Sequence, residues 1–183
     1  MPEPVQPQHS IALIGFMGCG KSTVGRQLHH LLGYPLVDTD HLIEEQAGCR
    51  IAAIFGEHGE ERFREIETGV LRQLAASPAT RRIIATGGGI VVRPENRALL
   101  RQLGCVVWLR ADIETILART SRNRDRPLLD TDDPRSRIEA LLAERMPLYS
   151  STCHLEIEST GLSSNEIACG ILESARYFFT SQP

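Results

Sequence analysis

Residues near the N-terminus have the types and the spacing of a phosphate-binding loop. They read Gly15-Phe16-Met17-Gly18-Cys19-Gly20-Lys21-Ser22, in the pattern G-x-x-x-x-G-K-S, and Thr23 follows. An apolar run at 11–14 precedes them, so we expect a strand, a glycine-rich loop (the P-loop) and a helix. Backbone N–H groups, the helix N-terminus and Lys21 would then surround a nucleotide phosphate, and Ser22 would reach Mg²⁺. The alternative is a chance glycine turn, and the strand–loop–helix context argues against it.

Two aspartates follow a second apolar segment, at 36–38. Asp38 and Asp40 are separated by Thr39, and we expect them at the carboxyl end of a strand, where open parallel sheets bind their ligands. One carboxylate could hold Mg²⁺ through water while the other orients an acceptor hydroxyl. The alternative is that one of them only caps the next helix.

A third apolar segment, at 82–86, ends in Thr86-Gly87-Gly88-Gly89. Three glycines let a ligand approach the backbone closely, and their N–H groups could bind a carboxylate or a hydroxyl. The alternative is a flexible turn without a ligand.

Two arginines have positions that require an explanation. Arg145 follows two leucines by three and four residues, which puts it on or beside an apolar helix face, so its charge needs an anionic ligand or an internal salt bridge. Arg64 lies four residues after Glu60 and three before Glu67, where a solvated ion pair on the helix surface is the simpler explanation.

A polar stretch at 121–133 has no hydrophobic periodicity, and arginines cluster in and beside it: Arg119, Arg122, Arg124 and Arg126. With the Pro127-Leu128-Leu129 that follows, the cluster predicts a lid that closes over phosphates and excludes water. A solvated basic loop is the alternative. Cys19, inside the P-loop, is interpreted as a small filler residue rather than as a reactive thiol.

The elements that must position these residues alternate between strand and helix patterns, which predicts an α/β fold with a parallel sheet. Strands are expected at about 10–14, 36–38, 82–86, 105–109 and 154–157, and helices at about 21–33, 39–48, 51–55, 60–76, 94–104, 112–120, 134–149 and from 163 onward. The first helix should bury Val24, Leu28, Leu31 and Leu32 on one face. No linker or repeat divides the chain, so we expect a single domain at 10–180 after a flexible tail at 1–9.

Composition narrows the class of protein. The chain has 183 residues, a net charge of −3, 42% hydrophobic and 23% charged residues, which is typical of one globular domain and argues against a general nucleic-acid binder. No apolar stretch approaches the ~20 residues of a membrane helix. The five cysteines are odd in number, widely spaced and without a C-x-x-C, which predicts a reducing cytoplasm. We expect a monomer without nucleic-acid or membrane partners.

Taken in order, these motifs resemble the shikimate kinases, which belong to the nucleoside-monophosphate-kinase-like P-loop group. The matching pieces are the P-loop, D-T-D at 38–40, F-R-x-x-E at 63–67, T-G-G-G at 86–89, R-P-L-L at 126–129 and R-x-P-L-Y at 145–149. Each motif is modest alone, and six in the same order are specific. The resemblance covers nearly the whole chain.

The resemblance implies ATP-dependent phosphorylation of the 3-hydroxyl of shikimate, in the synthesis of chorismate and aromatic amino acids, with ATP and Mg²⁺ as cofactors. It implies a three-layer α/β/α fold around a five-stranded parallel sheet. The acceptor-binding region would lie at about 39–67 and the lid at about 119–133.

The resemblance also implies roles for individual residues. The catalytic residues would be Asp40, as base or orienter, together with Lys21 and Arg126. ATP would bind at Gly18, Cys19, Gly20, Lys21, Ser22, Thr23, Arg119, which stacks on adenine, and Arg126, which moves with the lid. Shikimate would bind at Asp40, Arg64, Gly87, Gly88, Gly89, Arg145, Phe55 and Phe63, the two arginines holding its carboxylate. Mg²⁺ would bind at Ser22 and, through water, at Asp38.

One departure and two alternatives remain. The loop after the last strand reads Ser159-Thr160-Gly161-Leu162, without the arginine or proline that relatives often place against adenine. Another P-loop kinase of an anionic polyol, such as a gluconate kinase, would not be expected to carry both D-T-D and R-x-P-L-Y. A nucleotide-bound switch without chemistry would not require Lys21, Asp40 and Arg145 together.

Overall fold

The computed structural model describes residues 10–77, 81–121 and 132–180. In this part of the chain, a five-stranded sheet has the order β2-β3-β1-β4-β5, and all neighbouring strands are parallel. The strands are β1 (Ser10–Ile14), β2 (Leu36–Asp38), β3 (Ile83–Ala85), β4 (Gly104–Arg110) and β5 (Leu155–Glu158). The helices are α1 (Lys21–Leu32), α2 (Thr39–Ala47), α3 (Ile51–Ala76), α4 (Pro94–Leu103), α5 (Ile113–Thr120), α6 (Pro134–Thr152) and α7 (Ser164–Thr180).

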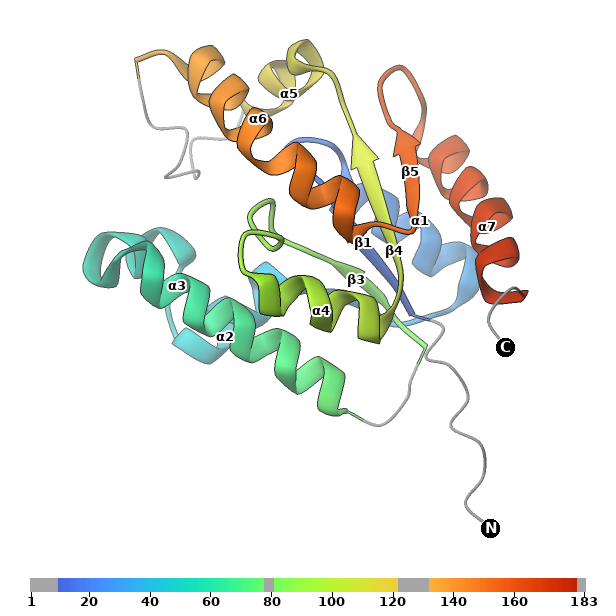
Figure 1. Ribbon diagram of the computed structural model, residues 1–183, viewed down its shortest axis with the longest axis horizontal. Coiled ribbons are helices and arrows are strands. Elements are labelled where there is room, and N and C mark those ends of the chain that lie inside the picture. Colours follow the sequence, from blue (N-terminus) through green and yellow to red (C-terminus); the bar gives the residue numbers. More distant parts are fainter. Residues whose placement is uncertain (1–9, 78–80, 122–131, 181–183) are drawn as a thin grey trace.

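Helices cover both faces of the sheet, which confirms the predicted three-layer α/β/α fold (Figure 1). The central strand β1 is buried throughout, and its residues alternate between two cores because successive side chains of a strand point to opposite faces. Ala12 and Ile14 pack with side chains of α3, α4 and α6, whereas Ile11 and Leu13 pack with those of α1 and α7. None of the described helices has both the length and the apolar character needed to cross a membrane.

The boundaries differ from the sequence prediction in informative ways. The helices expected at 51–55 and 60–76 form α3, which is broken at Gly59 by a left-handed φ of 78° and a ψ of 175°. Leu31 of α1 is 43% exposed rather than buried, because the buried face of that helix is formed by residues such as Gly25 and Leu28. Helix α6 continues to Thr152, past the expected end at 149.

The parallel arrangement brings three sequence motifs to one edge of the sheet. Strands β1 and β3 are in register at Leu13 and Ala85, and β2 and β3 at Asp38 and Ala85. The P-loop, the Asp38–Asp40 segment and the glycine run therefore all begin at the carboxyl ends of adjacent strands, where ligands of such sheets bind. The tail at 1–9 and residues 122–131 of the expected lid lie outside the described residues.

Candidate active site

The P-loop depends on two glycines whose backbone or surroundings exclude a side chain. A Cβ on Gly15 would lie 2.3 Å from the Leu109 carbonyl oxygen, so the start of the loop must be glycine. Gly20, with a φ of 100°, is the N-cap of α1 and provides no side-chain cap. The first N–H groups of α1 therefore remain available to an anion at the positive end of the helix.

Lys21 lies inside the loop that precedes it. Its side chain is 7% exposed, and Nζ donates to the carbonyl oxygens of Gly15 at 2.7 Å and Phe16 at 2.9 Å. The Cys19 side chain is buried, as expected of a filler residue, and its Sγ is 3.7 Å from the same ammonium. This ammonium is the positive charge that a triphosphate would meet in the P-loop.

Ser22, in the first turn of α1, faces the first aspartate, at the end of β2. Its hydroxyl donates to Oδ2 of Asp38 at 3.2 Å. A hydroxyl and a carboxylate oxygen suit a hard cation such as Mg²⁺, so the residues present fit the metal implied by the P-loop. The described residues contain no cluster of three or more histidine, cysteine or acidic side chains that could hold an ion, so phosphate and water would have to complete its coordination.

The structure distinguishes Asp38 from Asp40: one caps a helix, and the other faces the glycine run. Asp38 is the N-cap of α2, because its Oδ1 accepts from the backbone N–H of Asp40 at 3.0 Å and of His41 at 3.4 Å. Asp40 lies in the first turn of α2 and faces the glycine run: a Cβ on Gly87 would lie 2.7 Å from its Oδ1. The cap is therefore Asp38, and the carboxylate at the meeting point of the loops is Asp40.

The glycine run is closely packed and is not a loose turn. Its N–H at Gly87 donates to the Thr39 hydroxyl at 3.3 Å. A Cβ on Gly88 would lie 3.0 Å from the Met17 backbone nitrogen, and one on Gly89 would lie 2.4 Å from both terminal nitrogens of Arg64. None of these three glycines has a positive φ, so close packing rather than backbone conformation favours them: the run touches the P-loop backbone on one side and a guanidinium on the other.

Arg64 is buried, which contradicts the solvated surface pair although both expected partners are correct. The residue is 4% exposed, and its guanidinium pairs with Glu60 at 2.9 Å and with the buried Glu67 at 3.0 Å. Burial raises the pKa of the Glu67 carboxyl to about 7, and the Arg64 charge opposes that rise. The guanidinium also lies 5.1 Å from the centre of the Phe63 ring.

Arg145 is buried and forms no direct ion pair among the described residues, although its charge opposes the rise that burial causes in the pKa of the nearby Glu67 carboxyl. It is 2% exposed, its Nε has no hydrogen-bond partner, and no carboxylate of the described chain forms an ion pair with it. One terminal nitrogen donates to the Gly88 carbonyl oxygen at 3.4 Å, and the guanidinium lies 5.9 Å from the Phe16 ring. A buried guanidinium without a direct ion pair and with an unpartnered Nε is costly, so an anionic ligand explains it better than an internal salt bridge does.

The remaining expected site residues lie around this centre. Phe55 and Phe63 are in contact, with ring centres 4.8 Å apart. Arg119 is exposed, and its guanidinium donates to the Gly18 carbonyl oxygen of the P-loop at 3.0 Å. Thr23 is exposed on α1. Arg126 lies outside the described residues.

Sequence reasoning missed polar residues that support the site from behind. Asn96 of α4 is fully buried and donates to Glu67 at 3.4 Å, and its position four and seven residues before Leu100 and Leu103 marked it as a polar residue on an apolar face. Ser159, also buried, donates from its hydroxyl to carbonyl oxygens that include that of Cys19 at 3.1 Å, a contact that no spacing along the chain indicates.

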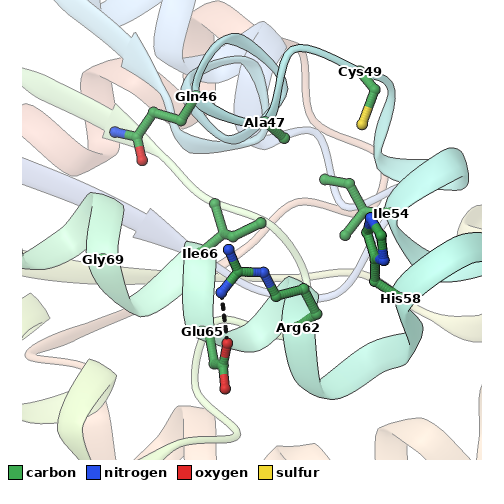
Figure 2. Close-up of a pocket in the computed structure, with 9 residues that line it drawn as sticks. All are labelled: Gln46, Ala47, Cys49, Ile54, His58, Arg62, Glu65, Ile66 and Gly69. Atoms are coloured by element: carbon green, nitrogen blue, oxygen red, sulfur yellow. Dashed lines mark hydrogen bonds and ion pairs between the residues drawn. The ribbon is translucent and has the colours of Figure 1, made fainter.

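A separate pocket of about 420 Å³ lies between the end of α2 and the outward side of α3 (Figure 2). Gln46, Cys49, His58 and Arg62 are among its lining residues. The Arg62 guanidinium forms an ion pair with the Glu65 carboxylate at 2.8 Å. None of the predicted catalytic, ATP-binding or shikimate-binding residues that the structure describes lines it.

Comparison with known proteins agrees with this geometry. The family model described as shikimate kinase matches residues 17–176. A shikimate kinase of Thioalkalivibrio sulfidiphilus is 44% identical over 92% of this chain and 86% of its own length, and one of Symbiobacterium thermophilum is 45% identical over 90% and 94%. The solved shikimate kinase from Acinetobacter baumannii in complex with shikimate has a TM-score of 0.89 and 40% identity, over 94% of this chain and 96% of that one. The chain therefore belongs to the shikimate kinase family and is a small-molecule kinase with the P-loop kinase fold.

Proposed function

We propose that this kinase transfers the γ-phosphoryl group of ATP to the 3-hydroxyl of shikimate, with Mg²⁺ bound to the nucleotide. The observation that carries the proposal is Arg145, a buried guanidinium that forms no direct ion pair in the described chain and lies beside Phe16 of the P-loop and Gly88 of the glycine run. An acceptor that carries both a carboxylate and hydroxyl groups supplies the charge that this arginine lacks. The Acinetobacter baumannii relative, solved with shikimate, supports that choice of acceptor.

On the nucleotide side, the chain binds phosphate and limits how it moves. Lys21 exchanges its contacts with the Gly15 and Phe16 carbonyls for phosphate oxygens, and the N–H groups at the start of α1 add to the cradle. Ser22 and Asp38 would hold Mg²⁺, the latter through water. When bound, ATP supplies the phosphoryl group and Mg²⁺ neutralises charge on it.

On the acceptor side, the chain orients one hydroxyl toward the phosphate. Asp40 accepts the hydrogen of that hydroxyl and fixes its direction. Arg64 and Arg145 bind the carboxylate, for which two planar guanidinium groups give a defined orientation. The N–H groups of the glycine run and the rings of Phe55 and Phe63 complete the proposed pocket. Catalysis then rests on positioning and charge neutralisation rather than on a covalent step.

The lid, the cellular location and the oligomeric state are proposed from the sequence. Arg126 moves onto the transferring phosphate with the lid, and Arg119 stacks on adenine. The protein acts as a monomer with small-molecule ligands; its dispersed cysteines are the ground for a cytoplasmic location, and its net charge of −3 is the ground for the absence of a nucleic-acid partner. Sedimentation equilibrium tests the monomer: a mass near 20.3 kDa is expected, and twice that mass contradicts it.

A coupled assay that detects ADP tests the function. The purified protein is given ATP and Mg²⁺ with shikimate or with gluconate, and turnover is expected with shikimate alone. The product should be identified by NMR as the 3-phosphate. Turnover of gluconate but not of shikimate would overturn the proposal, and ADP release that no acceptor stimulates would indicate a nucleotide-bound switch.

A further inference from the structure

We propose that Tyr149 is a positioning residue of the acceptor site. Its hydroxyl holds the Gly88 carbonyl oxygen and so leaves the Arg145 guanidinium available to an acceptor carboxylate. This inference rests on the function proposed above and adds a residue whose side chain lies behind the site.

The side chain of Tyr149 is held rigidly. It is fully buried on α6, and its ring stacks on Trp108 of β4, with centres 5.6 Å apart and an angle of 26° between the planes. Its hydroxyl donates to the Gly88 carbonyl oxygen. Burial raises the pKa of the Tyr149 phenol, and the charge and hydrogen bonding of Arg145 oppose that rise, so the hydroxyl is protonated and can donate at neutral pH.

The Gly88 carbonyl oxygen is shared between two donors of unequal quality. Tyr149 makes the shorter contact, whereas the Arg145 terminal nitrogen is 3.4 Å away, at the long end of the hydrogen-bond range. Gly88 is half-buried, so its carbonyl oxygen is partly withdrawn from water and is stabilised by a protein donor. Without the phenol, Arg145 is the donor that remains to Gly88 among the described side chains, so its guanidinium would be drawn onto the carbonyl and away from a ligand.

The same peptide links both sides of the site. In a trans peptide the N–H of Gly89 points away from the carbonyl of Gly88, so fixing the carbonyl also fixes that N–H. Gly89 lies against the Arg64 guanidinium, and Gly88 lies against the P-loop at Met17. One hydrogen bond from Tyr149 thus sets the relation between the carboxylate-binding arginines and the phosphate-binding loop.

The test is Tyr149→Phe, which keeps the ring and removes the hydroxyl. The Michaelis constant for shikimate should rise by about three- to tenfold, the range that the loss of one neutral hydrogen bond predicts. The Michaelis constant for ATP and kcat should change by less than about twofold, because no nucleotide contact is removed. Thr152→Val is the matched control: its buried hydroxyl donates to the Leu148 carbonyl at 2.6 Å in the same helix, away from the site.

Two further measurements separate positioning from a loss of packing. 4-Aminophenylalanine at position 149 restores an N–H donor and should return the Michaelis constant for shikimate toward the wild-type value. If Tyr149→Phe does not fold, the 4-aminophenylalanine variant is compared directly with the wild type. Its weaker donor should then raise the Michaelis constant for shikimate slightly and leave that for ATP unchanged. In an Arg145→Lys background, Tyr149→Phe should add less than about twofold, since the two residues act on one interaction.

Three results would overturn the inference: an unchanged shikimate constant in Tyr149→Phe, an equal rise for ATP, or an equal rise in Thr152→Val. Absence of shikimate turnover by the wild-type protein would instead overturn the proposed function. The two failures are therefore distinguishable in one set of assays.

Discussion

At the scale of single residues, Arg64 and Arg145 have the same charge and similar burial, but among the described residues only Arg64 forms ion pairs. Arg64 has Glu67 and Glu60 as partners, whereas Arg145 has no ion-pair partner in the described chain. Removing a partner from a buried pair leaves an uncompensated charge, but removing an unpaired buried charge leaves none. We therefore expect the two arginines, both proposed to bind the acceptor carboxylate, to contribute oppositely to the free energy of unfolding.

The paired substitutions Arg64→Met and Arg145→Met test this difference. Arg64→Met should lower the free energy of unfolding by about 3 kcal/mol, because the Glu67 carboxylate loses its counterion. Arg145→Met should leave that free energy unchanged or raise it, although shikimate binding is lost. Urea denaturation measures the first quantity and calorimetry the second. Equal destabilisation by both substitutions would contradict the assignment of Arg145 to a ligand.

Asp40→Asn removes the proposed proton acceptor but keeps the size of the side chain. We expect kcat to fall by about 10²–10⁴, with little change in the Michaelis constant for ATP. Glu45→Gln, an exposed change on the same helix, is the control and should leave turnover unaffected. Near-normal turnover of the Asn variant in the coupled assay would exclude the role given to Asp40.

At the scale of elements, two glycines of α3 differ in backbone conformation: the conformation at Gly59 requires glycine, and that at Gly69 does not. Gly59 has a left-handed φ of 78° where the helix breaks, and Gly69 lies in regular helix; a Cβ on either one would meet no atom within 4 Å. Backbone conformation therefore decides the effect of a methyl group at Gly59, and helix propensity decides it at Gly69.

Gly59→Ala and Gly69→Ala should accordingly change stability in opposite directions. The first should destabilise by about 1–3 kcal/mol because alanine strains the break, and the second should stabilise by about 0.5–1 kcal/mol. Thermal and urea unfolding of the two variants provide the comparison. A stabilised Gly59→Ala variant would mean that the break at Gly59 is not needed to orient the two parts of α3.

A hydrogen bond to a titratable histidine lies between β4 and the start of β5, the outermost strand on that side of the sheet. The Val106 N–H donates to Nδ1 of His154 at 2.9 Å, which requires that nitrogen to be unprotonated. Burial lowers the pKa of His154, and the charge of Arg101 lowers it further. Because the folded-state pKa lies below the unfolded value of about 6.5, the contribution to stability is complete above that pH and is lost as the pH falls through the folded-state pKa.

His154→Asn keeps an acceptor near the same place and cannot titrate. The free energy of unfolding of the wild type should therefore fall more steeply than that of the variant when the pH is lowered from 7 to 5. Urea unfolding at a series of pH values measures both slopes. Parallel slopes would show that His154 does not titrate differently in the folded and unfolded chains.

At the scale of the whole molecule, one sheet edge joins loops that are far apart in the sequence. The P-loop, Asp40 and the glycine run converge there from three neighbouring strands, and Arg145 joins them from α6 although it lies 57 residues from Gly88. Two hydrophobic cores on opposite faces share the sheet, so we expect residues 10–180 to unfold as a single cooperative unit.

Ligands should raise the midpoint of that transition independently through their two half-sites. ATP with Mg²⁺, or shikimate, at about 100 times its dissociation constant should stabilise the native state by about 2.7 kcal/mol. In Arg145→Met the increase with shikimate should vanish while the increase with ATP remains. Scanning calorimetry records both, and two separate transitions, or loss of the ATP effect in this variant, would contradict a single unit with separable half-sites.

The sequence alone determined the motifs and the fold class, because both depend on spacing along the chain. The P-loop and the alternation of strands and helices were predicted from local patterns, and the structure and the comparisons confirm the fold and the family. The partners of Arg64 were also predictable, since Glu60 and Glu67 lie within one turn of the same helix.

The tertiary structure decided which charges are buried and which are compensated. The Arg64 guanidinium packs against Gly89, where a side chain would collide with it. Arg145 forms no direct ion pair in the described chain because its guanidinium faces Gly88 and the Phe16 ring. Which of Asp38 and Asp40 caps α2, and the contact of Tyr149 with Gly88, were decided in the same way. Packing between elements distant in sequence has no period along the chain, so local patterns could not predict these contacts.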